Sequence, residues 1–336
     1  MTEPSAVLGV DSGGSGLRVA LGVADGLRRP APRTSDEPVR TGPRGIDAEH
    51  MLAQLTPMVR ELLAEAGGGR LTAVAVGAAG MGTLGDDLRE RLPSALAELF
   101  GAHRVALAAD AVTAYAGALG QRPGAVVAAG TGLVALGTDL TAWRRADGWG
   151  HLLGDCGGGA WIGRAGLEAA MRAFDGRLGG SAALRARAED RFGSPLSDLP
   201  GLLYPRTDRP AVLAGFAPDV GRCAADGDPV AARILREAAA HIADAAAAAC
   251  PAAAGHAGDR EGEDEGACEV ALTGGLLKLG DVLLDPLEAE LTERLPYARR
   301  VPAAGGPLDG AVRIAVDLAA GTLKLPHDPR LLHVAA

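Results

Sequence analysis

VLGVDSGGSGLRVALGV, residues 7–23, joins two apolar runs through a glycine-rich loop. Beyond the loop, apolar side chains recur at positions 17, 19, 21 and 23, with the period of two that is typical of a strand. Dinucleotide-binding and P-loop glycines open a helix instead, and a P-loop ends in a lysine, whereas the only lysines here are Lys278 and Lys324. The stretch therefore predicts a strand, a glycine hairpin and a second strand.

Asp11 stands directly before this glycine loop. Backbone N–H groups in a tight glycine turn can bind an anion, and the missing side chains let a phosphate approach closely. A carboxylate beside that phosphate would repel it unless a hard cation such as Mg²⁺ lay between them. Asp11 is therefore either a magnesium ligand or an ordinary turn residue, and this loop alone leaves both interpretations open.

Two further segments carry glycines at the ends of apolar runs. GAVVAAGTGLVALG, residues 124–137, repeats the pattern of strand, loop and strand, about 120 residues after the first unit, and predicts a duplicated architecture with one phosphate hairpin in each half. The third segment, residues 268–291, ends a short strand at Gly274-Gly275 and continues as a helix. Paired glycines at a helix start suit contact with a flat ring or a sugar, although they also serve close packing alone.

In this order the segments resemble the actin-like ATP-binding fold shared by sugar kinases, actin and heat-shock chaperones. A narrower resemblance, to N-acetylglucosamine kinases and the related BadF/BcrA-type ATPases, rests on GWGHLLGDCGGGAWIGRAGLEAAMRAF (148–174), LAADAVTAYAGALG (107–120) and GPLDGAVRIA (306–315). The resemblance implies an α/β protein of two actin-like (ribonuclease H-like) domains, with a duplicated mixed β-sheet core flanked by helices and an interdomain cleft.

The expected domains are residues 1–118, joined by a closing helix near 308–321, and residues 119–307. Apolar patterning predicts single helices near 84–99 and 208–225 among others. The Gly-, Ala- and acid-rich segment 251–267 is predicted to be a mobile surface loop without a catalytic role.

The resemblance also implies ATP and Mg²⁺, with a role for each glycine segment. The implied phosphate-binding residues are Gly13, Gly14, Ser15, Gly130, Thr131 and Gly132, the adenosine-binding residues are Gly274 and Gly275, and Asp11 would bind Mg²⁺ through water.

Asp110 matches the catalytic aspartate of these kinases. Phosphoryl transfer to a sugar hydroxyl needs a base that accepts the hydroxyl proton, and Asp110 ends an apolar strand and starts a helix. The resemblance makes it the general base and a sugar contact. Asp is also a common helix N-cap, which is the structural alternative.

The implied sugar-binding residues are Asp110, Gly130, Trp149, Gly150 and Asp155. Asp155 would accept a hydrogen bond from a ring hydroxyl, or it could cap the following helix. Trp149 and Trp161 would line the sugar or fill the core, and His151 is predicted to be a packed residue and not a base. One departure concerns the sugar contact, because Arg44-Gly45 stands where the related kinases carry an Asn.

Charge and cysteine usage exclude several classes. A net charge of −9 without basic clusters argues against nucleic acid and anionic membranes, and the absence of a signal segment or of a long apolar run predicts a cytoplasmic protein. The cysteines have no C-x-x-C pairing, which predicts reduced thiols and argues against the iron–sulfur activators of the BadF/BcrA-type group. They stand at positions 156, 223, 250 and 268.

The predicted function is an ATP-dependent kinase that phosphorylates N-acetylglucosamine at its 6-hydroxyl. The alternatives are a kinase of glucosamine or another hexose, and a non-catalytic sensor that binds ATP or sugar. A small-molecule sugar is the expected partner, and a homodimer remains open.

Overall fold

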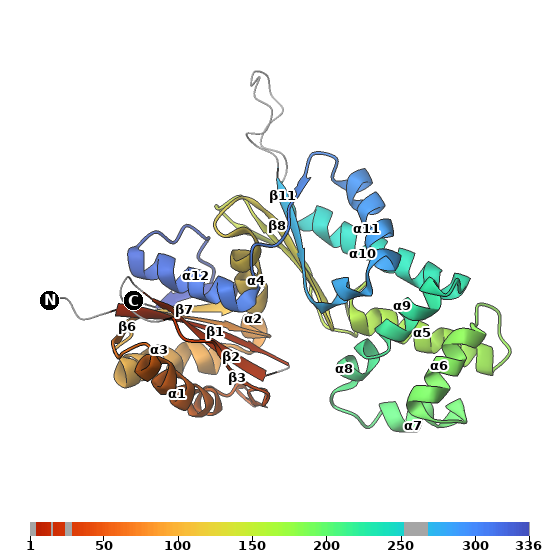
Figure 1. Cartoon of the computed structure of the whole chain (residues 1–336), viewed down its shortest axis with the longest axis horizontal. Helices are drawn as coiled ribbons and strands as arrows, with labels where there is room; N and C mark the ends of the chain where they lie inside the picture. The colour runs from red at the N-terminus through yellow and green to blue at the C-terminus, as the bar shows by residue number, and fades with distance from the viewer. Residues whose placement is uncertain (1–4, 15, 24–28, 252–267, 336) are drawn as a thin grey trace, which may run out of the picture. The chain divides into compact units, whose positions relative to one another are not determined.

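The computed structural model describes residues 5–14, 16–23, 29–251 and 268–335, which form two compact units (Figure 1). Unit 1 comprises Met1–Val126, Gly137–Trp143 and Val301–Ala336, and unit 2 comprises Val127–Leu136 and Arg144–Arg300. None of the helices in the described ranges is long and apolar enough to span a membrane.

Unit 1 contains a six-stranded sheet in the order β13-β7-β6-β1-β2-β3. Its strands are β1 (Ser5–Gly13), β2 (Gly16–Val23), β3 (Arg33–Ser35), β6 (Arg70–Ala78), β7 (Arg104–Ala109) and β13 (Leu332–Ala335). The predicted hairpin is confirmed, because β1 and β2 pair antiparallel with Gly13 opposite Gly16. β6 runs parallel to β1, and β7 runs parallel to β6.

Helices cover both faces of this sheet, with α12 and α1 on opposite sides (Figure 1). The helices of the unit are α1 (Ala48–Glu65), α2 (Met81–Leu84), α3 (Asp86–Phe100), α4 (Asp110–Leu119) and α12 (Pro307–Ala320), and β4 (Thr41–Gly42) pairs with β5 (Gly45–Ile46). Glycines allow α12 to pack closely: a Cβ atom at Gly310 would lie 1.9 Å from the carbonyl oxygen of Thr113 in α4. The single helix predicted near 84–99 is wrong at its start, because α2 ends before Gly85 and α3 begins after it.

A second sheet has five strands in the order β10-β9-β8-β11-β12, and most of its residues belong to unit 2. Its strands are β8 (Gly124–Ala129), β9 (Leu133–Thr138), β10 (Trp143–Asp147), β11 (Glu269–Thr273) and β12 (Arg299–Arg300). Only three residues join β8 to β9, its neighbour in the sheet, and so short a connection requires an antiparallel pair. The second predicted hairpin is therefore also present.

The helices of unit 2 are α5 (Gly159–Phe174), α6 (Ala182–Phe192), α7 (Leu199–Leu203), α8 (Arg209–Ala214), α9 (Ala217–Ala225), α10 (Pro229–Ala249) and α11 (Asp281–Arg294), with 3₁₀ turns η1 (Leu196–Asp198) and η2 (Gly275–Leu279). The single helix predicted over 208–225 is wrong, because α8 ends at Ala214 and α9 begins at Ala217, with Pro218 in the first turn, where proline is favoured. The helix expected directly after Gly275 begins only at Asp281, because Gly280 has a φ of +74°.

Cys250 and Cys268 form a disulfide, so the prediction that all four cysteines are reduced thiols is wrong. Cys250 follows α10 and Cys268 precedes β11, and both side chains are buried. Cys156 and Cys223 are free thiols. Apart from Pro251, the segment 251–267, predicted to be a surface loop, lies outside the described residues.

Candidate active site

The first glycine loop, between β1 and β2, has room for a ligand. A Cβ atom at Gly13 or Gly14 would meet nothing within 4 Å, so packing does not explain either glycine. Open space above exposed backbone is what a phosphate needs for close approach. Ser15, the third phosphate-binding residue predicted here, lies outside the described residues.

Asp11 is buried, with 5% of its surface exposed, and forms an ion pair with Arg18, which lies directly opposite on β2. No group of three or more metal-ligating side chains occurs among the residues that the structure describes. Mg²⁺ in phosphate-transfer sites commonly uses one or two carboxylates, with phosphate and water completing the shell. Asp11 fits that donor pattern, with Arg18 as the cation that already balances its charge.

Asp110 is the first residue of α4, immediately after β7. The N-cap position belongs to Ala109, and the Oδ1 of Asp110 accepts the N–H of Ala111 at 2.9 Å. The capping alternative therefore does not describe this carboxylate. Its helix turn is held against β6, since a Cβ atom at Gly77 would lie 2.6 Å from the Thr113 side chain.

The second glycine loop, residues 130–132, is hydrogen-bonded to the first residues of α5. The carbonyl oxygens of Gly130 and Thr131 accept the N–H groups of Gly159 and Ala160, each at 2.8 Å. In a trans peptide the following N–H points opposite to the carbonyl. The N–H groups of Thr131 and Gly132 therefore point away from α5, and a Cβ atom at Gly130 would meet nothing within 4 Å. This loop can donate two backbone hydrogen bonds to a phosphate.

Asp155 lies beside this second loop. Its Oδ1 accepts the N–H of Gly150 at 3.1 Å, and a Cβ atom at Gly132 would lie 2.3 Å from its Oδ2. Burial raises the pKa of Asp155, and the carboxylate of Asp147 adds to this increase. Asp155 does not cap α5, whose N-cap is Gly158 without a side-chain hydrogen bond. Unit 2 thus brings a carboxylate of the predicted sugar site against the predicted phosphate loop.

Asp147 is a residue that the sequence reasoning missed. Its Oδ1 accepts the N–H groups of Gly148 at 2.7 Å and Asp155 at 2.6 Å, and its Oδ2 accepts that of Cys156 at 2.8 Å. The Asp-Gly pair at 147–148 could have indicated a turn, but its bonds to residues eight and nine positions later have no local signal.

The two tryptophans of the predicted sugar segment differ. Trp149 is 62% exposed, with the guanidinium of Arg145 4.5 Å from its ring centre, so it does not fill the core. Trp161 packs edge-on against His241, with ring centres 5.1 Å apart. His151 lies half-buried in the turn after Gly150. Only Trp149 therefore offers a largely exposed ring.

The paired glycines after β11 have different structural reasons. Gly274 has a φ of +111°, and a Cβ atom there would lie 2.1 Å from the carbonyl oxygen of Ala129. Gly275 has open space at the same position. Close packing accounts for Gly274, whereas Gly275 leaves room for a bound ring.

Arg44, which stands where an Asn was expected, forms ion pairs with two carboxylates of α3. Its guanidinium lies 2.5 Å from Asp87 and 3.3 Å from Glu90. Gly45 has a φ of +97° and fits against the backbone of Leu84. The side chain of Arg44 is thus already paired with carboxylates within unit 1.

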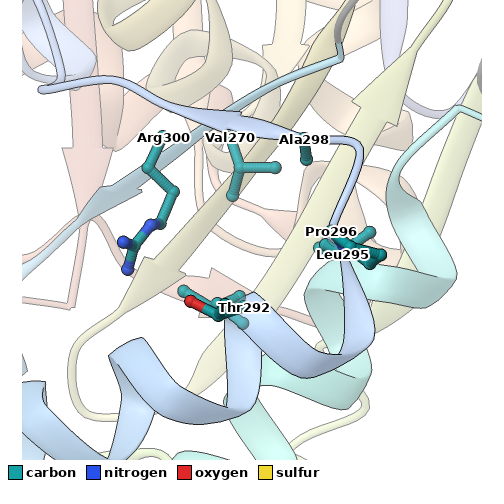
Figure 2. Close-up of a pocket in the computed structure, with 7 residues that line it drawn as sticks. Val270, Thr292, Leu295, Pro296, Ala298 and Arg300 are labelled. Atoms are coloured by element: carbon teal, nitrogen blue, oxygen red, sulfur yellow. The ribbon is translucent and has the colours of Figure 1, made fainter.

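A pocket between β11, β12 and α11 contains none of the predicted site residues (Figure 2). It is lined by Val270, Leu291, Thr292, Leu295, Pro296, Ala298 and Arg300. Arg300 forms an ion pair with Glu288, so its charge is balanced. No carboxylate and no glycine loop suited to a phosphate or a sugar lies among its lining residues.

The two glycine hairpins, each carried by its own mixed sheet, define an ATPase of the actin-like fold. The ROK-family glucokinase from Streptomyces griseus, solved with glucose and AMPPNP, has the same fold, with a TM-score of 0.53 and 21% identity over 94% of this chain and 99% of that one.

 The ROK hexokinase from Thermus thermophilus is 18% identical, with a TM-score of 0.53, over 93% of this chain and 97% of that one. At these identities the likeness shows the fold alone.

Within that class, residues 8–306 match the model of the BadF/BadG/BcrA/BcrD ATPase family, and the chain belongs to this family. It is 28% identical over 240 residues to the N-acetylmuramic acid/N-acetylglucosamine kinase of Clostridium acetobutylicum, which covers 69% of this chain and 75% of the relative. It is also 28% identical, with a TM-score of 0.65, to the protein provisionally named N-acetylglucosamine kinase from Chromobacterium violaceum, over 91% of this chain and 97% of the other.

Proposed function

We propose that this protein is an ATP-dependent amino-sugar kinase that phosphorylates N-acetylglucosamine at its 6-hydroxyl. The observation that carries the proposal is the contact between Asp155 and Gly132, which joins a hydroxyl-binding carboxylate to a loop suited to phosphate. The names of the two relatives at 28% identity support the same substrate class.

The proposed chemistry uses residues of both units. Asp110 accepts the proton of the sugar hydroxyl as the bond to phosphorus forms, and Asp155 orients the sugar through another hydroxyl. The two glycine loops bind the ATP phosphates through backbone N–H groups, and Gly275 leaves room for adenosine. Mg²⁺, when bound, neutralises phosphate charge, and Asp11 would hold it through water.

An assay of ADP release across a panel of sugars tests this function. The panel contains N-acetylglucosamine, N-acetylmuramic acid, glucosamine and glucose, with a control that lacks sugar. Turnover that depends on N-acetylglucosamine supports the proposal, and phosphorus NMR of the product identifies the hydroxyl. Equal turnover without sugar would identify an ATPase, and binding without turnover would identify a sensor.

We further propose Mg²⁺ dependence, a cytoplasmic location, a small-molecule sugar as the partner, and no binding to nucleic acid or membranes. Chelation should abolish turnover and added Mg²⁺ should restore it. Whether the protein is a homodimer is measured by light scattering after size-exclusion chromatography.

A further inference from the structure

We propose that Asp147 is a positioning residue that holds Asp155 in place for the sugar. The proposal rests on the function proposed above, because it concerns the same sugar site.

Asp147 ends β10 next to the strand that carries the second phosphate loop. β9 and β10 are neighbours in the sheet, and a Cβ atom at Gly148 would lie 2.8 Å from the Val134 side chain. Asp147 has a φ of +59°, a conformation that Asp and Asn adopt more readily than most other residues. This turn starts the loop that leads to Asp155 and α5.

Both oxygens of Asp147 bind the far end of this loop. Oδ1 accepts the N–H of Asp155 and Oδ2 that of Cys156, so the carboxylate fixes the backbone on either side of the peptide that joins them. An amide could replace Oδ1, but its NH₂ group would then face the N–H of Cys156 as donor against donor. The site therefore requires a carboxylate and not merely a polar side chain of the same size.

Close contacts of Asp147 and Asp155 connect these hydrogen bonds to the phosphate loop. A Cβ atom at Gly154 would lie 2.3 Å from the Oδ1 of Asp147, and one at Gly132 would lie 2.3 Å from the Oδ2 of Asp155. Neither glycine has room for a side chain, so the Asp147 carboxylate packs against the backbone at Gly154 and the Asp155 carboxylate against the backbone at Gly132. Asp147 therefore positions Asp155, the carboxylate proposed to bind the sugar, and has no proposed contact with the substrate itself.

The charged and titratable groups around Asp155 set what a pH experiment would measure. Asp147 raises the pKa of Asp155 and His151 lowers it, while burial is the largest cause of its increase. Arg145 from β10 bonds to the carbonyl oxygens of Asp147 and Gly148, and the Cys156 thiol follows Asp155 directly.

The first test is a double-mutant cycle with Asp147→Asn and Asp155→Asn. Asp147→Asn should raise the sugar KM about tenfold or more, because an ordered charged hydrogen-bond network is lost, and should leave the ATP KM near wild type. In the Asp155→Asn background the same change should have little further effect on the sugar KM. Full additivity, or an unchanged sugar KM in a folded variant, would overturn the proposal.

Asp139→Asn is the matched control. Asp139 also accepts two backbone N–H groups in a turn, those of Thr141 and Ala142, but it lies at the opposite end of β9 from Gly132. This variant should keep the sugar KM of the wild type. An equal rise in both variants would show a general effect of loop disruption and would also overturn the proposal.

A second readout needs no turnover. Carbon NMR of labelled aspartate carboxyls in the ligand-free protein should show a lower pKa for Asp155 in Asp147→Asn, because the neighbouring negative charge is gone. An unchanged pKa would contradict the coupling. If the wild type phosphorylated no sugar, the proposed function would fail, whereas this titration would still decide whether Asp147 controls Asp155.

Discussion

At the scale of single residues, the two aspartates proposed for the sugar differ in how the chain holds them. Asp110 occupies the first turn of α4, where a negative charge interacts favourably with the helix dipole. Asp155 has a φ of +56°, and burial together with the nearby Asp147 carboxylate raises its pKa, so its ionised form is disfavoured. The position of Asp110 therefore favours an ionised carboxylate, whereas the position of Asp155 disfavours one and so lowers the stability of the folded state.

Asp110→Asn should separate catalysis from structure. If Asp110 is the general base, kcat should fall by about 10² to 10⁴, with the melting temperature and ATP binding near wild type. Asp86→Asn is the control, because Asp86 is the first residue of α3 as Asp110 is the first residue of α4. Steady-state kinetics decide the matter, and a folded Asp110→Asn variant with most of its sugar-dependent turnover would exclude the role.

Asp155→Asn should remove a pH-dependent destabilisation of the protein while weakening its binding of sugar. The raised pKa of Asp155 means that ionisation disfavours the folded state, so the penalty is fully present above its folded pKa and absent below its unfolded pKa. The melting temperature of the variant relative to that of the wild type should therefore be higher near pH 7 than in acid. Calorimetry at several pH values measures this difference, and a difference that did not change with pH would contradict the prediction.

At the scale of elements, local patterns predicted the hairpins but not the cross-links between distant segments. Both strand–glycine–strand units are visible in sequence because alternation and glycine act over a few residues. The break before Pro218 was also readable, and the helix predicted over 208–225 overlooked it. The bonds of Asp147 and the disulfide were not readable, because they depend on how separate segments pack.

The disulfide should stabilise unit 2 by closing a loop in the unfolded chain. Cys250 and Cys268 are 18 residues apart, and a cross-link of that length contributes about 3 kcal/mol in the chain-entropy model. A variant with both residues changed to Ser should therefore be less stable than the oxidised wild type by about that amount. Denaturant unfolding with and without reductant measures this, and the difference should largely disappear when the wild type is reduced.

At the scale of the whole molecule, the chain carries two sheets, each with its own glycine hairpin and buried core. The sequence predicted this duplication because the two hairpins repeat one pattern. The proposed reaction uses residues of both units, so substrate binding should affect both units.

Hydrogen exchange should reveal this dependence. With N-acetylglucosamine and a non-hydrolysable ATP analogue present together, amides in the first glycine loop of unit 1 and in residues 147–158 of unit 2 should exchange more slowly. The pocket beside β12 serves as an internal reference and should be unaffected. Protection confined to one unit would contradict a reaction that uses both.

The exposure of Trp149 makes the protein its own optical probe. Trp143 donates its indole N–H to the carbonyl of Pro326 and Trp161 packs on His241, so Trp149, at 62% exposure, is the tryptophan most open to solvent. A soluble quencher such as iodide should reach its ring, and a sugar lying against it should shield the emission. Fluorescence could then follow sugar binding without ATP, coupling enzymes or a label.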